Sequence, residues 1–308
     1  MLLSQAEKEI LAVLCFFDVM NLPLTLLELK KWLKSEISFS RLTELLLGVN
    51  LARLVQEQDG FYFLAGRQEI LKSRLANYLS SSKKITKARR IIKILKYFPW
   101  LEASAIYSSV SLFNADKVSD IDLFFIMAPG RLWSARFWLN LFLKFFRLRP
   151  TPRTSQDKIC ASYLVTSDAL DLTKANLVQD DWWHYYGLAN FLFVFADDNL
   201  KEKFFSVNNW LKEYFFGFQP ADFAKSEIIR YRRLKNFFQA LAGLVPESFY
   251  RALQLLILPS KYKAIMNLDT RVIINSQIIK LHQRDKGRAY NQLFLNRYQE
   301  ILNEASTA

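Results

Sequence analysis

The chain has 308 residues, of which 51% are hydrophobic and 15% aromatic, and 42 Lys and Arg against 29 Asp and Glu give a net charge of +13. This composition excludes a disordered chain, and the length suggests about two domains. With two Cys and two His residues, a disulfide framework and a His-rich zinc site are excluded. The eight glycines form no Walker A loop, G-x-G-x-x-G or G-x-S-x-G motif, which excludes the common glycine-rich nucleotide-binding folds.

The basic residues are concentrated towards the two ends of the chain. Residues 1–100 and 201–308 are strongly basic, whereas residues 101–200 carry a slight excess of acid. An acidic middle is typical of a site that holds cations, and basic flanks attract polyanions such as nucleic acid. The alternative is that the charge keeps a very aromatic chain soluble. Neither a signal peptide nor an apolar stretch of spanning length is seen, so we expect no transmembrane segment and a cytoplasmic location.

Residues 1–66 are predicted to form a small domain of three helices and a hairpin. Thr25 and Glu28 match the capping box that begins a helix. Gln58-Asp59-Gly60 is a turn signal between two strand-like runs. The predicted helices cover residues 5–20, 25–33 and 40–48, and the predicted strands cover 51–56 and 61–64.

This order of elements is that of a winged helix, whose third helix enters the DNA major groove. In this chain the third helix carries only Arg41 and Glu44 as charged residues, which is poor for binding phosphates. A packing or partner-binding domain is therefore the alternative to DNA binding.

Residues 67–98 are predicted to form a basic connector of one or two helices, with Ser80-Ser81-Ser82 as the break between them. Apolar residues alternate with charges, so that one face packs and the other is basic. That basic face is either a solvated surface or an electrostatic surface for nucleic acid or a triphosphate. Its cations are Lys83, Lys84, Lys87, Arg89, Arg90, Lys93 and Lys96.

Residues 99–175 change to strand-like patterns and contain the one constellation with clear chemistry. Asp120 and Asp122 begin the predicted strand 121–127, and strand alternation points both to the same face. Two such carboxylates repel each other without a cation, and Mg²⁺ takes hard oxygen ligands that it shares with phosphates. Ser108 and Ser109 end the preceding strand, 103–107, where hydroxyl and N–H groups suit phosphate oxygens. A helix over 132–148 and a strand over 159–165 follow.

Here the sequence resembles the nucleotidyltransferase fold of the DNA polymerase β-like superfamily, whose signature is Gly-Ser, a short helix and Asp-x-Asp entering a strand. It is more narrowly similar to uncharacterised bacterial nucleotidyltransferase-domain proteins with an N-terminal winged helix. The resemblance spans roughly residues 5–298. The matching residues are Asn114-Ala115, Ser119-Asp120-Ile121-Asp122, Leu132-Trp133, Arg136, Asp157-Lys158-Ile159-Cys160, Asn209-Trp210, Gln254, His282 and Asp285.

The resemblance implies Mg²⁺-dependent transfer of a nucleoside monophosphate from an NTP to an unknown acceptor. Asp120 and Asp122 would be the catalytic residues and hold the metal. The nucleotide would be bound by Ser108, Ser109, Arg136 and Lys158.

Two departures from the family pattern favour an alternative. Ser108 stands where the family has glycine, and strand 159–165 has no third carboxylate. Asp157 lies at the margin of that strand, and Asp168 and Asp171 follow it, so the third ligand stays unassigned. The alternative is a catalytically degenerate nucleotide-sensing or nucleic-acid-binding regulatory protein.

Residues 176–308 are predicted to be mostly helical, which completes an α+β fold of winged helix, small mixed-sheet nucleotidyltransferase domain and helical C-terminal region. The aromatic cluster 182–186 suits either helix packing or base stacking. Basic and aromatic residues alternate at 230–233 and 261–263, as on nucleic-acid surfaces or on polar helix faces. An amphipathic membrane-surface role for residues 237–258 is a further alternative.

Overall fold

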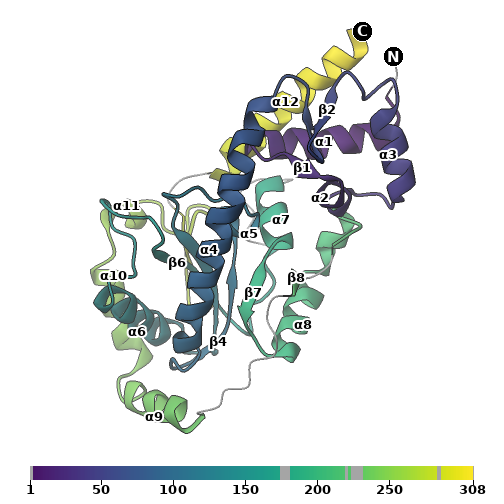
Figure 1. The fold of residues 1–308 in the computed structure, drawn as a ribbon. Coiled ribbons are helices and arrows are strands. Elements are labelled where there is room, and N and C mark those ends of the chain that lie inside the picture. Colours follow the sequence, from purple (N-terminus) through teal and green to yellow (C-terminus); the bar gives the residue numbers. More distant parts are fainter. Residues whose placement is uncertain (1–2, 174–180, 219–220, 223–231, 283–285, 308) are drawn as a thin grey trace.

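The computed structural model describes residues 3–173, 181–218, 221–222, 232–282 and 286–307 (Figure 1). Arg230, Tyr231 and Asp285, which the sequence analysis singled out, lie outside the described residues. The chain is an α+β protein built on one seven-stranded mixed sheet, with a three-stranded sheet in its N-terminal part and several helices in its C-terminal region.

The N-terminal module contains the predicted three helices and hairpin. The Thr25 hydroxyl accepts a hydrogen bond from the Glu28 N–H, and the Glu28 carboxylate accepts from the Thr25 N–H, which confirms the capping box. Asp59 and Gly60 both have positive φ, as the predicted tight turn requires. The winged-helix assignment itself stays a prediction. The elements are α1 (Gln5–Val19), β1 (Leu24–Thr25), α2 (Leu26–Lys31), α3 (Phe39–Leu47), β2 (Val55–Gln58) and β3 (Phe61–Leu64), with the strands in the order β1-β3-β2.

The basic connector is a short 3₁₀ turn, η1 (Gln68–Ile70), followed by one continuous helix, α4 (Leu71–Leu95). Ser80, Ser81 and Ser82 do not interrupt it. Each of these hydroxyls makes a hydrogen bond, two of them to the loop before Asp120 and one to the turn of α4 before it. A serine run inside a helix is stable where its hydroxyls find such acceptors and donors.

The central sheet has the strand order β8-β7-β4-β5-β6-β10-β9. Strand β5 pairs antiparallel with β4 and parallel with β6, and β10 adds antiparallel to the other edge of β6. The strands are β4 (Leu101–Ile106), β5 (Ile121–Met127), β6 (Ile159–Thr166), β7 (Leu192–Phe195), β8 (Ala221–Asp222), β9 (Val272–Ile274) and β10 (Ile278–Leu281).

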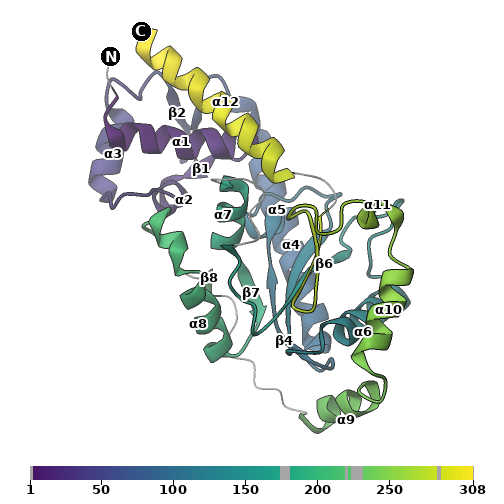
Figure 2. The same ribbon diagram turned by 180° about the vertical axis from the view of Figure 1, so that it is seen from behind.

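Strand β5 is buried on both faces, which explains its continuous apolar run. Leu123 and Phe125 point to a core shared with α4, α6 and α10, whereas Phe124 points to a core shared with α7, α8 and the N-terminal module. Figures 1 and 2 show these helices on the two faces of the sheet. The remaining helices are α5 (Ser108–Ser111), α6 (Leu132–Phe145), α7 (Trp182–Ala189), α8 (Asp198–Val207), η3 (Asn209–Glu213), α9 (Arg232–Ala242), α10 (Glu247–Leu256), α11 (Ser260–Lys263) and α12 (Lys286–Thr307).

The C-terminal helix α12 returns to the N-terminal module and lies along α1 (Figure 2). Tyr298 donates to the Lys8 carbonyl, and Arg297 lies 3.4 Å from Asp18. The two ends of the chain are thereby packed together. In the described part of the chain, we find no helix that combines the length and apolar character needed to span a bilayer.

Candidate metal centre

Three side chains with metal-binding atoms meet where β5 and β6 begin. Asp120 immediately precedes β5, Asp122 is its second residue, and Cys160 is the residue of β6 that lies beside Asp122 in the register. The ligand atoms of the three side chains all lie within 4.8 Å of one another. Each side chain is half-buried, so the group is reachable from outside.

A β-bulge in β6 brings more polar groups to the same face. Asp122 pairs with Cys160 and Phe124 pairs with Tyr163, so β6 has one residue more than β5 between these pairs. Such an extra residue bends a strand and re-aims its side chains. As a result Cys160, Ser162 and Tyr163 all line one cavity together with the two aspartates.

The cavity has a volume of about 460 Å³ and combines acidic, basic and aromatic groups. Lys261 and Lys280 line it along with Asp120 and Asp122. Phe16 and Met20 of the N-terminal module form part of its wall, so this module belongs to the site. The lining also includes Tyr107, Ser108, Trp183, His184, Tyr186, Phe191 and His282.

Hydroxyl and imidazole groups form a hydrogen-bonded cluster in this cavity. The His282 Nε2 lies 3.0 Å from the Tyr107 hydroxyl and 3.2 Å from the Ser162 hydroxyl, and Cys160 Sγ donates to Ser162 over 3.3 Å. The Tyr163 hydroxyl is buried and has no hydrogen-bond partner in the described part of the chain. Because an unpaired buried hydroxyl is costly, this group is suited to bind a polar ligand atom.

Burial controls the protonation of the groups around the aspartates. It raises the pKa of the Cys160 thiol, and the negative charge of Asp122 raises it further. Burial also lowers the pKa of His184 to about 3, with Lys280 adding to the effect. At neutral pH Cys160 is therefore a thiol and His184 a neutral imidazole, whose Nε2–H donates to the Leu172 carbonyl.

Ser108 occupies the left-handed region with φ +66°, directly after the strand β4 that leads to the site. This is a conformation that glycine adopts without strain and other residues rarely adopt. Ser108 lines the cavity, whereas Ser109 is not among the described residues that line it.

Lys84 of α4 holds the loop that carries Asp120. Its ammonium group is buried and donates to the Ser119 carbonyl at 2.8 Å, the Lys117 carbonyl at 3.2 Å and the Asp157 carboxylate at 2.6 Å. Ser119 precedes Asp120, and Asp157 lies three residues before Cys160. One buried cation therefore ties together the two segments that supply the metal-binding atoms.

Other residues predicted for the site lie elsewhere. Arg136 is buried and donates to the Gln254 side chain at 2.6 Å, and Lys158 donates to the Arg147 carbonyl. Neither is among the described residues that line the cavity, and their role as phosphate ligands stays a prediction. Asp168 accepts from Gln277 and Asp171 from Thr173. Among the described residues, the third side chain that could hold a metal beside the aspartates is Cys160.

Sequence reasoning missed Cys160 as a site residue and Lys280 altogether. A signal for Lys280 was available, because a lone charge inside the apolar run 278–281 is unusual for a buried strand. Cys160 could be recognised only from its position next to Asp122 in the neighbouring strand. That position depends on the register of the sheet, which the sequence does not contain. Lys261 was recognised as a surface cation but not as part of the cavity.

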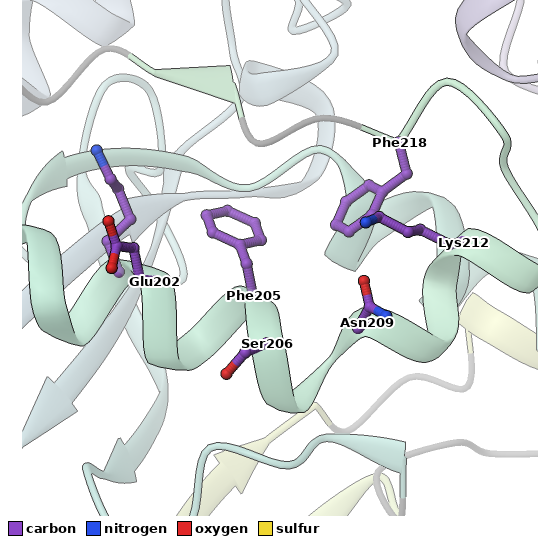
Figure 3. Close-up of a pocket in the computed structure, with 7 residues that line it drawn as sticks. Glu202, Phe205, Ser206, Asn209, Lys212 and Phe218 are labelled. Atoms are coloured by element: carbon purple, nitrogen blue, oxygen red, sulfur yellow. The ribbon is translucent and has the colours of Figure 1, made fainter.

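A second hollow of about 300 Å³ lies at α8 and η3 (Figure 3). Phe205 and Phe218 line it, together with Lys212 and Glu202. Glu202 is the one carboxylate among the described residues that line this hollow. The hollow therefore has no acid pair like that of the larger cavity.

No family model, curated protein or solved structure matches this chain. The resemblance to the nucleotidyltransferase superfamily therefore stays a prediction from the sequence motifs.

Proposed function

We propose that the protein is a Mg²⁺-dependent nucleotidyltransferase that uses the cavity at β5 and β6. The observation that carries the proposal is the pair Asp120 and Asp122 facing a cavity that also contains two lysines. Carboxylates are the ligands that Mg²⁺ prefers, and a cavity with both signs of charge suits a metal–triphosphate.

Each part of the cavity has a role in this proposal. Asp120 and Asp122 would hold Mg²⁺, which would supply charge neutralisation for the triphosphate and the leaving pyrophosphate. Lys261 and Lys280 would bind phosphate oxygens. The aromatic lining, which includes Trp183 and Phe191, would enclose the base. An acceptor oxygen would then attack the α-phosphorus, and the bond to pyrophosphate would break. A cytoplasmic location, where NTPs are available, fits this role.

Calorimetry of MgATP binding tests the proposal. We expect the double variant Asp120→Asn/Asp122→Asn to lose MgATP binding, because the neutral amides no longer hold the metal. Asp171→Asn is the matched control, since this exposed carboxylate bonds to Thr173. Binding that is unchanged in the double variant, or that does not need Mg²⁺, would contradict the proposal.

A nucleotide-sensing protein without turnover is the second candidate, and Cys160 is the observation that favours it. Sulfur is a soft ligand and binds a hard cation poorly, so a site with Cys160 holds Mg²⁺ more weakly than one with three carboxylates. We expect Cys160→Asp to tighten Mg²⁺ binding roughly tenfold. Turnover of labelled NTP that appears only in Cys160→Asp would identify the native chain as a sensor, whereas turnover in the native chain would identify an enzyme.

Nucleic acid is a proposed partner through the exposed face of α4. Lys83, Arg89, Arg90 and Lys93 are exposed there, while Lys84 on the opposite side is buried. Binding through these side chains should weaken steeply as salt is raised.

A further inference from the structure

The apolar side of helix α9 faces solvent. Phe237, Phe238 and Leu241 follow the spacing of one helix face and are 63%, 42% and 56% exposed. The opposite side faces the protein: Lys235 donates to the Leu101 carbonyl, and Ala242 is buried. A surface helix normally buries its apolar stripe, so α9 has the reverse orientation.

Helix α10 buries Tyr250 in the core but also carries apolar side chains on its outer side. Phe249 is 55% exposed and Leu256 is 75% exposed there. The inner side carries polar groups, because Gln254 bonds to Arg136 and Glu247 accepts hydrogen bonds from backbone N–H groups at the start of α6. Figures 1 and 2 show α9, α10 and α11 along one side of the molecule, away from the N-terminal module.

We call this side the α9–α11 surface and define it by its exposed apolar side chains. Several large apolar side chains exposed on neighbouring helices favour an interaction site. They are Phe237, Phe238, Leu241, Leu244, Phe249, Leu256, Ile257, Met266 and Leu268.

The charge of the α9–α11 surface favours one kind of partner. Residues 232–268 contain six Lys and Arg residues and one acid, Glu247, which is bonded to α6. Arg233, Arg251, Lys261 and Lys263 are exposed around the apolar side chains. Two copies of this basic surface would repel each other, which disfavours a homodimer.

We infer that the α9–α11 surface docks on a bilayer that contains anionic lipids. Helices that lie in the membrane interface combine exposed Phe and Leu with flanking Lys and Arg. The apolar side chains would enter the acyl boundary, and the cations would contact the anionic headgroups. Apart from Lys261, which also lines the cavity, this surface is separate from the aspartate pair, and the inference does not depend on the proposed function.

Vesicle flotation with the full chain tests the inference. We expect binding to phosphatidylcholine vesicles that contain phosphatidylglycerol and much weaker binding to phosphatidylcholine alone. The variant Phe237→Ser/Phe238→Ser/Leu241→Ser keeps every charge and should lose roughly tenfold or more in affinity. Circular dichroism would show that it stays folded, as the exposure of all three residues predicts.

The control places the same number of changes on another exposed apolar region. Leu27→Ser/Leu47→Ser/Val49→Ser alters three exposed residues of the N-terminal module and should bind vesicles like the native chain. Equal binding by the α9 variant would overturn the inference, because net charge alone would then explain attachment. Absence of vesicle binding, with a dimer that the α9 variant converts to monomer, would also overturn it and assign the surface to a second copy.

Discussion

Ser108 is a residue held in an unfavourable backbone conformation beside Asp120 and Asp122. Its φ of +66° lets the chain turn sharply from β4 into α5 at the cavity wall. For an L-residue this conformation costs about 1–2 kcal/mol. The cost is tolerated because the surrounding strands fix the turn, and such strain is typical of functional sites.

We predict that Ser108→Gly raises the free energy of unfolding by about 0.5–1 kcal/mol. The relief of steric strain exceeds the extra entropy that glycine brings to the unfolded chain. Ser109→Gly should have the opposite sign, since Ser109 is not among the residues with positive φ. Chemical denaturation of both variants measures the difference, and a loss of stability in Ser108→Gly would show that the turn is not strained.

Helix α4 positions the loop that leads to Asp120 through a set of polar side chains on one of its faces. Asn77, Ser80 and Ser81 bond to the loop at residues 114–116, and Lys84 bonds to residues 117 and 119. The loop has few apolar groups of its own, so these hydrogen bonds fix the position of Asp120. The polar face of α4 is therefore a structural support for the site.

We predict that Lys84→Met weakens Mg²⁺ binding even though Lys84 is not among the described residues that line the cavity. The methionine keeps the apolar stem but removes the ammonium group that donates to the Lys117 carbonyl and the Asp157 carboxylate. This should cost about 1–3 kcal/mol of stability and loosen the loop. Calorimetry and thermal unfolding check both effects. The control Lys83→Met changes an exposed residue one position away and should alter neither the Mg²⁺ affinity nor the stability. Unchanged Mg²⁺ affinity in Lys84→Met would show that Lys84 does not position the site.

Elements with local signals could be predicted from the sequence, and long-range arrangements could not. The capping box at Thr25 and the strand over 121–127 depend on neighbouring residues, and both are confirmed. The strands β7, β9 and β10 were missed within a region predicted to be mostly helical, because short apolar runs fit a buried strand and a buried helix equally well. The pairing of Asp122 with Cys160 needed the register of β5 and β6, which no local pattern contains.

One apolar core joins parts of the chain that the sequence suggested as separate regions. The boundaries 1–66, 67–98, 99–175 and 176–308 stay a prediction. Strands β7, β9 and β10, which follow residue 175, lie in the same sheet as β4, β5 and β6. Phe16 of α1 stacks on Tyr186 of α7 with ring centres 4.0 Å apart. The N-terminal module and the sheet are therefore expected to unfold together.

Phe294 of α12 tests this coupling, because its ring contacts both Phe16 of α1 and Trp182 of α7. We predict that Phe294→Ala lowers the free energy of unfolding by about 3–5 kcal/mol through the cavity that it leaves. Denaturation is followed by circular dichroism and by tryptophan fluorescence. Both signals should show a single unfolding transition at the same denaturant concentration, and Phe294→Ala should shift both to the same lower concentration. Leu295→Ala, at a neighbouring exposed position, should have little effect. If instead two transitions appeared and only one moved, the N-terminal module would be an independent domain, and its residues Phe16 and Met20 would be only a removable wall of the cavity.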